Sequence, residues 1–362
     1  MSRYKKYIEK TVLEEAKERL HLIFDTHDTP VVLFSGGKDS QVLLHLTWEV
    51  AQERGLKFVN ALFRHDEFTI APTIDFVRHY AAMPWVRMNH LCIPEPTLRY
   101  VFDKPITYRQ WDRNRETIRP IPDYAIFPTA DGWERKWYVE QVEEYQCQFY
   151  VGKVAQLNGI RASESRFRWR ASVNKLVDNY INNPLGYKKA TLCKPLFDWE
   201  ENDILKYLYD NKIPYCKLYD WQFFSKMEMR TSSFLHPEKI RHLKKLRQID
   251  PAFYEQILKI FPDQVVHDRY AEARDDSKII EKYGNNGLQG VHDYIIDHYP
   301  DDENRQAALF RLHEIQQLRK SERNKSLDTY PIPYVLKYFI RGQIWKLLLP
   351  ERKGQKEWRN LV

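Results

Sequence analysis

The sequence has few cysteines and no long apolar segment. Only 4 of its 362 residues are cysteine, and no two of them form a C-x-x-C motif. This dispersion argues against a local zinc or iron–sulfur signature and indicates buried, reduced thiols. No apolar run approaches the roughly 18 residues that a membrane-spanning helix needs, and the charged first residues contain no signal-peptide core. We therefore expect a cytoplasmic protein without an iron–sulfur cluster.

The charged residues nearly balance, with a small basic excess. Lys and Arg number 57 against 50 Asp and Glu, which gives a net charge of +7. This excess suits an anionic ligand or a polyanionic partner, but by itself it does not identify nucleic acid. Hydrophobic residues make up 43% of the chain and aromatic residues 14%. The chain can therefore form one large or two ordinary domains with a sizeable core.

A glycine turn between two regular patterns is the most informative stretch. Residues 31–34 form an apolar, β-type run, and a helical pattern begins at Gln41. The turn between them consists of Ser35, Gly36, Gly37, Lys38, Asp39 and Ser40. Glycines let successive N–H groups point at an anion, and the start of a helix adds further donors and a partial positive charge. The stretch predicts a phosphate site in which Asp39 caps the helix or holds a cation.

The turn does not have Walker A spacing. It resembles the PP-loop of the ATP pyrophosphatase and phosphoadenosine-phosphosulfate (PAPS) reductase superfamily. Three later segments resemble motifs of the same superfamily: Gly-Ile-Arg-Ala-Ser-Glu-Ser-Arg at 159–166, Pro-Leu-Phe-Asp-Trp at 195–199 and Leu-Tyr-Asp at 218–220. The resemblance covers about 28–235. It is closest to the larger PAPS-reductase-like proteins of phages, plasmids and genomic islands, some of which accompany ParB-like partners.

The resemblance implies an α/β fold with a doubly wound, mainly parallel sheet of the adenine nucleotide alpha hydrolase-like (HUP) type. The residue pattern indicates such a sheet as well, with helices at 11–25, 40–54 and 73–82 alternating with strands at 30–34, 57–63 and 85–93. Prolines interrupt the pattern at 94–137, which we expect to be an irregular insertion. We assign residues 1–235 to a nucleotide-binding domain and 236–362 to a helical C-terminal domain.

The resemblance also implies roles for individual residues. Lys38, Asp39 and Arg161 are the expected catalytic residues, and Asp39 is the candidate ligand of Mg²⁺. The expected nucleotide-binding residues are Ser35, Gly36, Gly37, Lys38, Asp39, Ser40, Asp66, Gly159, Arg161, Glu164, Arg166 and Asp198. The forked donors of arginine suit phosphate or sulfonate oxygens.

Two of these assignments have a structural alternative. Asp66 and its neighbour Glu67 follow the strand at 57–63, where doubly wound sheets place ligands, but the end of a strand also carries solvated carboxylates. Asp198 is suited to cap the helix that follows it, with Glu201 as its capping-box partner. That capping role alone is a sufficient reason for both residues.

Residues 108–119 combine four arginines with Tyr108 and Trp111. Such a segment can contact phosphates and stack on bases. It can equally be a surface loop whose arginines pair with local acids. The sequence leaves both interpretations open.

The resemblance implies an enzyme that binds ATP with Mg²⁺, adenylylates an acceptor and releases pyrophosphate. PAPS reduction is an alternative, but it needs a C-terminal thiolate, and residues 217–362 contain no cysteine. The acceptor can belong to nucleic acid, as in DNA phosphorothioation or tRNA thiolation, with a partner that brings the sulfur. A non-catalytic nucleotide sensor acting with a ParB-like partner is a further alternative, and the sequence leaves a homo-oligomer open.

Overall fold

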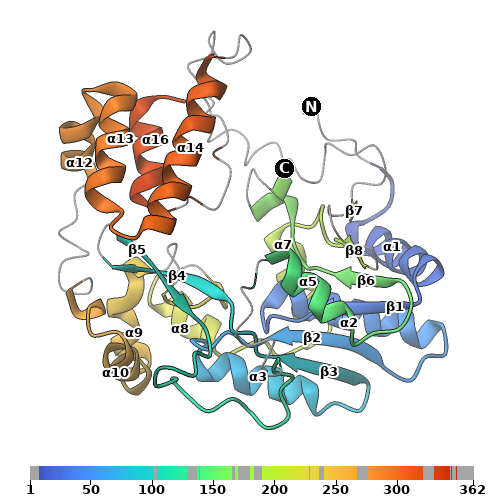
Figure 1. The fold of residues 1–362 in the computed structure, drawn as a ribbon. Coiled ribbons are helices and arrows are strands. Elements are labelled where there is room, and N and C mark those ends of the chain that lie inside the picture. Colours follow the sequence, from blue (N-terminus) through green and yellow to red (C-terminus); the bar gives the residue numbers. More distant parts are fainter. Residues whose placement is uncertain are drawn as a thin grey trace. The chain divides into compact units, whose positions relative to one another are not determined.

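The chain divides into two compact units. The computed structural model (Figure 1) describes residues 8–101, 104–128, 137, 139–164, 168–169, 180–182, 190–227, 229–235, 240–266, 276–320, 330–342, 344 and 348. The first unit takes the described residues from 8 to 96 and from 110 to 232, and the second takes those from 97 to 109 and from 233 to 348. The domain boundary near residue 235 stays a prediction. The structure adds that the short segment 97–109 groups with the C-terminal unit.

A six-stranded sheet forms the centre of the first unit, as far as its residues are described (Figure 1). Its strands are β1 (Thr29–Leu33), β2 (Val59–Arg64), β3 (Val86–Leu91), β6 (Val154–Leu157), β7 (Ile181–Asn182) and β8 (Ala190–Cys193). They lie in the order β3-β2-β1-β6-β8-β7. Every neighbouring pair is parallel except β7 and β8. The predicted α/β class with a mainly parallel sheet is confirmed.

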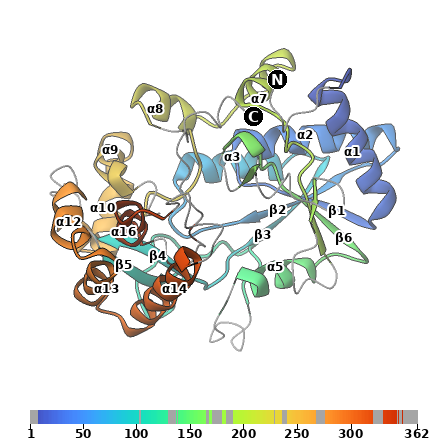
Figure 2. The same cartoon turned by 90° about the horizontal axis from the view of Figure 1, so that it is seen from above.

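Helices cover both faces of this sheet, as a doubly wound fold requires. They are α1 (Val12–Thr26), α2 (Lys38–Glu53), α3 (Ala71–Ala81), α5 (Val139–Cys147), α7 (Glu201–Asp210) and α8 (Leu218–Phe224). In Figure 2, α1, α2 and α3 lie on one side of β1, β2 and β6, and α5 lies on the other side. The first helix begins at a capping box between Thr11 and Glu14, which satisfies two N–H groups at its start.

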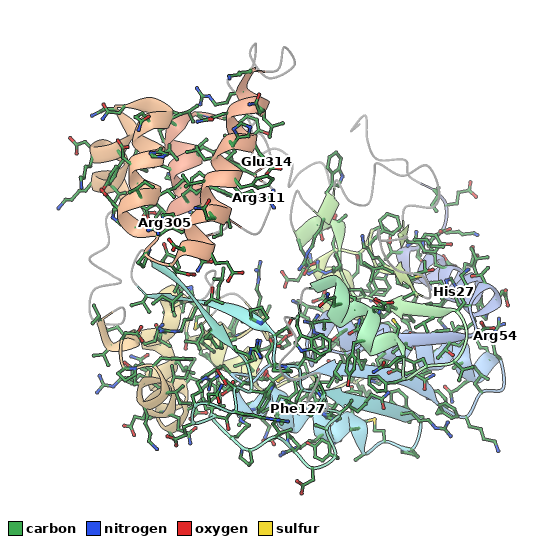
Figure 3. All side chains as sticks on the ribbon, viewed as in Figure 1. His27, Arg54, Phe127, Arg305, Arg311 and Glu314 are labelled. Atoms are coloured by element: carbon green, nitrogen blue, oxygen red, sulfur yellow. The ribbon has the colours of Figure 1, made fainter. Side chains whose placement is uncertain are left out.

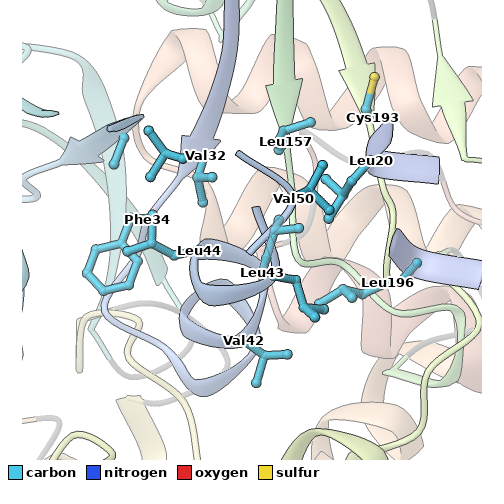
Figure 4. Packing of buried hydrophobic residues seen from close by; sticks show 14 of the residues in the cluster. Leu20, Val32, Phe34, Val42, Leu43, Leu44, Val50, Leu157, Cys193 and Leu196 are labelled. Carbon is cyan, nitrogen blue, oxygen red and sulfur yellow. The ribbon is translucent and has the colours of Figure 1, made fainter. Parts of the chain in front are cut away.

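Alternate residues of the strands enter two separate cores. Val32 and Leu157 pack with Leu43 of α2 in one core (Figure 4). Val31 faces the other side of the sheet, where it packs with Val142 of α5. Successive side chains of a strand point to opposite faces, and a sheet covered on both faces needs apolar residues at consecutive positions. The apolar run that precedes the glycine turn is therefore explained by burial on both faces.

The order of the strands brings two loops together. β1 lies between β2 and β6, so the chain leaves β1 toward one side of the sheet and leaves β6 toward the other. The loops at the carboxyl ends of these two strands meet at the switch point, where open α/β sheets bind ligands. The glycine turn at 35–40 and the motif at 159–166 begin in these two loops.

The second unit contains a two-stranded sheet and a group of helices. Its elements are β4 (Pro96–Val101), β5 (Lys104–Arg109), α9 (Leu243–Ile249), α10 (Pro251–Ile260), α12 (Asp276–Gly284), α13 (Gly287–His298), α14 (Asp302–Lys320) and α16 (Ile332–Ile340). Tyr294, Leu312 and Phe339, from α13, α14 and α16, share one apolar core. Arg311 and Glu314 form an ion pair on α14 (2.5 Å, Figure 3). The predicted helical C-terminal region is confirmed.

Part of the segment predicted to be irregular is regular. Strands β4 and β5 occupy residues 96–101 and 104–109, within the proline-interrupted stretch 94–137. Pro96 is the first residue of β4, and strand ends and edge strands tolerate proline because it need not donate to a neighbour. Further along, Ile126 pairs with the edge of β3, where its N–H donates to the His90 carbonyl (2.7 Å). None of the helices among the described residues is long and apolar enough to cross a membrane.

Candidate functional site

The loop between β1 and α2 has the geometry of an anion-binding turn. Gly36 has a φ of +72°, in the left-handed region that glycine adopts without a steric penalty. The Ser40 hydroxyl donates to the Gly37 carbonyl (2.9 Å), and the Ser35 hydroxyl accepts from the Gly37 N–H (3.3 Å). No side chain caps α2 at Gly37. The loop is thus held by its own hydroxyls, and it leads into the start of α2, the kind of position at which helices bind anions.

Tyr219 reaches this loop from α8. Its hydroxyl accepts the Lys38 backbone N–H (2.8 Å), and it lies 3.2 Å from the position of a Cβ added to Gly37. The phenol is buried, and burial raises the pKa of Tyr219 above its usual value. The phenol therefore stays neutral and keeps its own proton available for a ligand oxygen. The sequence places Tyr219 in the Leu-Tyr-Asp motif, but the motif alone predicted no role for it.

Lys38, Asp39 and Arg161 meet beside the loop. One oxygen of the Asp39 carboxylate accepts from Arg161 Nε, and the other lies 3.4 Å from Lys38 Nζ. Lys38 Nζ also pairs with Glu201 Oε1 at 3.1 Å. The side chains of Lys38 and Arg161 are each only 6% exposed, whereas Glu201 is 51% exposed. The two cations are thus balanced by two carboxylates, of which Glu201 is the more exposed to solvent.

Gly159 allows the loop after β6 to touch the start of α2. A Cβ at Gly159 would stand 2.9 Å from the Asp39 carbonyl carbon and 3.0 Å from the Ser40 nitrogen. Both are backbone atoms of a helix, which cannot move aside as a flexible side chain can. Gly159 therefore allows the close packing that brings Arg161 to Asp39, and its role in nucleotide binding stays a prediction.

The turn that carries Arg161 is fixed on both sides. Glu164, at the end of a short 3₁₀ turn (Ala162–Glu164), accepts from the Arg161 backbone N–H (3.2 Å). Arg161 Nη1 donates to the Ser163 hydroxyl (3.1 Å), which in turn donates to the Trp199 carbonyl (3.1 Å). Glu164 therefore shapes the turn that presents the guanidinium. Arg166, also predicted to bind nucleotide, lies outside the described residues.

Asp198 is not the cap of α7, contrary to the sequence-based expectation. The helix begins at Glu201, and Glu200 and Asp203 form its capping box. The Asp198 carboxylate instead accepts two hydrogen bonds of 2.7 Å from the Arg19 guanidinium. Arg19 also donates to the Pro195 carbonyl (2.9 Å). The segment before α7 is thus tied to α1, and it must stay non-helical to present these acceptors.

Asp66 and Glu67 belong to a separate cluster at the end of β2. Glu67 is fully buried and accepts from the Arg115 guanidinium (2.5 and 2.6 Å), from the Trp111 N–H (2.6 Å) and from the Ile118 N–H (3.2 Å). Glu67 is therefore an anchor for residues 111–118. Burial raises the pKa of Asp66 to about 6, although the nearby Arg64 opposes this shift. The charged and polar neighbours of Asp66 are Arg64, Glu95 and Gln110, which do not belong to the glycine turn, and its role in nucleotide binding stays a prediction.

The aromatic residues of the 108–119 segment are buried. Trp111 is 1% exposed and Tyr108 is 9% exposed. The Trp111 indole N–H donates to the His65 carbonyl (2.8 Å), and the Tyr108 ring packs against Phe261 (5.3 Å between centroids). The hypothesis that Tyr108 and Trp111 stack on bases is wrong because neither ring presents a free face. The alternative, arginines that pair with local acids, holds for Arg115.

All four cysteines are buried. Burial raises the pKa of Cys92 and Cys193 to about 12 and that of Cys147 to about 11, and it also raises the pKa of Cys216. A thiol that stays protonated at neutral pH is a poor nucleophile. Within the described part of the chain, no group of three His, Cys, Asp or Glu side chains is arranged to hold a metal ion.

The fold and this loop define an α/β nucleotide-binding protein of the PP-loop type. Residues 29–226 match the family described as "Phosphoadenosine phosphosulfate reductase domain". The chain therefore belongs to the phosphoadenosine phosphosulfate reductase domain family.

Comparisons with individual proteins give more distant similarities. The chain is 28% identical over 262 residues to the uncharacterized protein YbdN of Escherichia coli strain K12, a match that takes in 66% of this chain and 61% of that protein. The chain thus spans less than two thirds of the length of this relative. The structure is similar to FMN adenylyltransferase from Candida glabrata in complex with FMN and the ATP analogue AMPCPP, with a TM-score of 0.40, 16% identity and coverage of 65% of this chain and 69% of the other. It is also similar to PAPS reductase from Candida auris, with a TM-score of 0.37, 14% identity and coverage of 63% and 98%.

Proposed function

We propose that this chain binds ATP and transfers AMP to an acceptor, with release of pyrophosphate. The observation that carries the proposal is the meeting of the glycine turn, the start of α2 and two nearly buried cations, Lys38 and Arg161, at the switch point of the sheet. Charge develops on the α-phosphoryl oxygens and on the leaving pyrophosphate during adenylyl transfer. Donors that are already fixed in place stabilise that charge without reorganising.

Each group of the site has a role in this proposal. The pyrophosphate portion lies against the glycine turn and Lys38, whose ion pair with Glu201 gives way to phosphate. Arg161, oriented by Asp39, neutralises the remaining phosphate oxygens. Mg²⁺ commonly binds through one or two carboxylates together with phosphate oxygens. Asp39 fits this pattern because, among the described residues, one of its oxygens contacts only Lys38, at 3.4 Å. When bound, the ion would neutralise phosphate charge.

A sulfonucleotide is the second candidate ligand, because the chain belongs to the PAPS reductase domain family. Reduction of such a ligand requires an accessible thiolate that takes up the sulfonate. The four cysteines are buried, and their pKa values are raised. These properties favour adenylyl transfer over reduction.

We further propose that the acceptor belongs to nucleic acid, DNA or tRNA, and that a partner protein delivers sulfur to the activated position. The net charge of +7 supports a polyanionic acceptor. The burial of all four thiols supports an external sulfur source rather than an internal one. A regulatory role with a ParB-like partner is the alternative if no turnover occurs.

Product analysis tests the proposal. The purified chain is incubated with ATP and Mg²⁺, with and without DNA or tRNA, and the adenine nucleotides and phosphates are separated by chromatography. AMP with pyrophosphate is the expected result. ADP with phosphate, or no hydrolysis under any condition, would overturn adenylyl transfer. A parallel incubation with PAPS and a thiol reductant measures sulfite release and so tests the second candidate.

The substitution Lys38→Ala tests the site itself. Because Lys38 contributes a nearly buried charge at the phosphate position, its loss should lower kcat/KM by about 10²–10³-fold, while the far-UV circular dichroism spectrum stays unchanged. Lys10→Ala is the matched control, since Lys10 is half exposed and pairs with Glu18 at the surface. Full activity of Lys38→Ala would show that the site is assigned wrongly.

A further inference from the structure

Helix α8 has a buried face that supports the glycine turn. Leu218, Tyr219 and Gln222 are 1%, 5% and 0% exposed, at the spacing of one side of a helix. Tyr219 holds the Lys38 N–H. Gln222 bonds to both backbone groups of Arg230, at 2.6 and 2.8 Å. The short helix is therefore held firmly in place by its inner face.

The outer face of α8 carries three exposed aromatic side chains. Trp221, Phe223 and Phe224 are 38%, 69% and 81% exposed. The Phe223 and Phe224 rings lie 5.7 Å apart at an angle of 78°. Three large apolar side chains exposed together on seven residues are more than the scattered exposure of an ordinary surface, and such patches mark interaction sites.

A lysine stands at each end of this aromatic group. Lys217 precedes α8 and lies four residues before Trp221, which places both on the same side of the helix. Lys226 follows the helix with a φ of 52°, a region that usually favours glycine. Within the described residues neither lysine forms an ion pair. The single acidic residue of α8, Asp220, already accepts a hydrogen bond from the Tyr215 hydroxyl (2.8 Å).

We propose that Lys217, Trp221, Phe223, Phe224 and Lys226, here called the α8 platform, bind an unpaired nucleic-acid strand. Exposed rings stack on bases regardless of sequence, and unpaired lysines neutralise backbone phosphates. An apolar protein partner fits less well, because it would have to bury two lysines, and the single carboxylate of α8, Asp220, is already hydrogen-bonded to the Tyr215 hydroxyl (2.8 Å). This inference rests on the proposed function, because it identifies the acceptor of AMP as single-stranded nucleic acid. Binding of the strand itself does not require adenylyl transfer.

A binding assay without ATP tests the platform. Fluorescence anisotropy of a labelled oligothymidylate strand is measured with the wild-type chain and with Phe223→Ser combined with Phe224→Ser. Removing two stacking rings should weaken binding at least about tenfold. Lys217→Gln combined with Lys226→Gln should reduce the slope of log K against log salt by about 1.4, since each phosphate contact on a single strand contributes about 0.7.

An exposed ring outside the α8 platform provides the control. Tyr209→Ser removes an equally exposed ring, 84% accessible, from α7 and should leave binding unchanged. Failure of the wild-type chain to bind the strand, or equal losses for the control and the Phe223/Phe224 variant, would overturn the proposal. A loss of self-association in the Phe223/Phe224 variant without weaker strand binding, measured by sedimentation, would instead identify a contact between copies. Because ATP is absent, failure of adenylyl transfer would leave a positive binding result intact.

Discussion

Two segments of this protein share a composition but differ in exposure. The 108–119 segment and the α8 platform both combine aromatic with basic residues. Trp111 is 1% exposed, whereas Phe224 is 81% exposed. Arg115 is neutralised by the buried Glu67, whereas Lys217 and Lys226 have no such partner among the described residues. The difference indicates that the buried Glu67 carboxylate, rather than the composition of the segment, holds residues 111–118 inside this protein.

The largest effect should come from removing the carboxylate under the 108–119 segment. Glu67→Ala leaves Arg115 and the Trp111 and Ile118 N–H groups without their acceptor. Breaking a buried charge pair from one side costs about 3–5 kcal/mol, so the free energy of unfolding should fall by that amount in urea denaturation. Phe223→Ala, on the α8 platform, should change it by no more than about 0.5 kcal/mol.

A conservative variant separates charge from hydrogen bonding at Glu67. Glu67→Gln keeps an oxygen for the two backbone donors but removes the negative charge. Its free energy of unfolding should therefore lie between that of the wild type and that of Glu67→Ala. Equal stability of Glu67→Ala and Phe223→Ala would break the comparison, because it would mean that the 108–119 segment is not anchored by this carboxylate.

Removing the charge of the neighbouring carboxyl, Asp66, should raise the free energy of unfolding rather than lower it. The folded-state pKa of Asp66 is raised to about 6 by burial, whereas an unfolded aspartate titrates near 3.9. Between about pH 4 and 6 the folded state therefore holds a proton that the unfolded state has lost, and stability falls as pH rises through this window. Asp66→Asn should remove this loss and raise the free energy of unfolding at pH 7 by about 3 kcal/mol, since each unit of pKa difference is worth about 1.4 kcal/mol.

The measurement for Asp66 is the difference between variant and wild type at pH 4, 5, 6 and 7. The difference should be near zero at pH 4 and should grow to its full value by pH 7. Asp25→Asn, at a carboxylate that is 58% exposed, controls for the substitution itself. A variant less stable than the wild type at pH 7 would show that the pairing of Asp66 with Arg64 outweighs its burial.

The parts that the sequence predicted well depend on neighbours in the chain. Alternating helices and strands, the glycine turn and the later motif with Arg161 all follow from patterns within a few residues. The resemblance placed Arg161 and Asp39 in one site, but their ion pair was not predicted, because it depends on β1 and β6 lying side by side in the sheet. The confirmed fold and the arrangement of the loop follow from these local patterns.

The parts that the sequence did not predict depend on distant partners. The pair Arg19–Asp198 joins residues 179 positions apart, and the pair Glu67–Arg115 joins residues 48 positions apart. A capping pattern at Asp198 is locally as good as the one that forms at Glu200, and only the distant guanidinium decides between them. In the same way, the composition of residues 108–119 does not reveal that a buried carboxylate holds Trp111 inside.

The smallest predicted effect is on ATP affinity, and it concerns the inner face of α8. Tyr219→Phe removes the acceptor of the Lys38 N–H, so the start of α2 loses a neutral hydrogen bond worth about 0.5–1.5 kcal/mol. ATP affinity, measured by calorimetry, should fall by up to about tenfold.

Tyr215→Phe is the matched control, because its hydroxyl bonds to Asp220 rather than to the loop. Equal affinities in the two variants would show that Tyr219 only fills space, and a higher affinity in Tyr219→Phe would show that the phenol competes with phosphate for the amide. A selective loss would establish that the inner face of α8 serves the nucleotide site, and strand binding that persists in the same variant would separate it from the outer face.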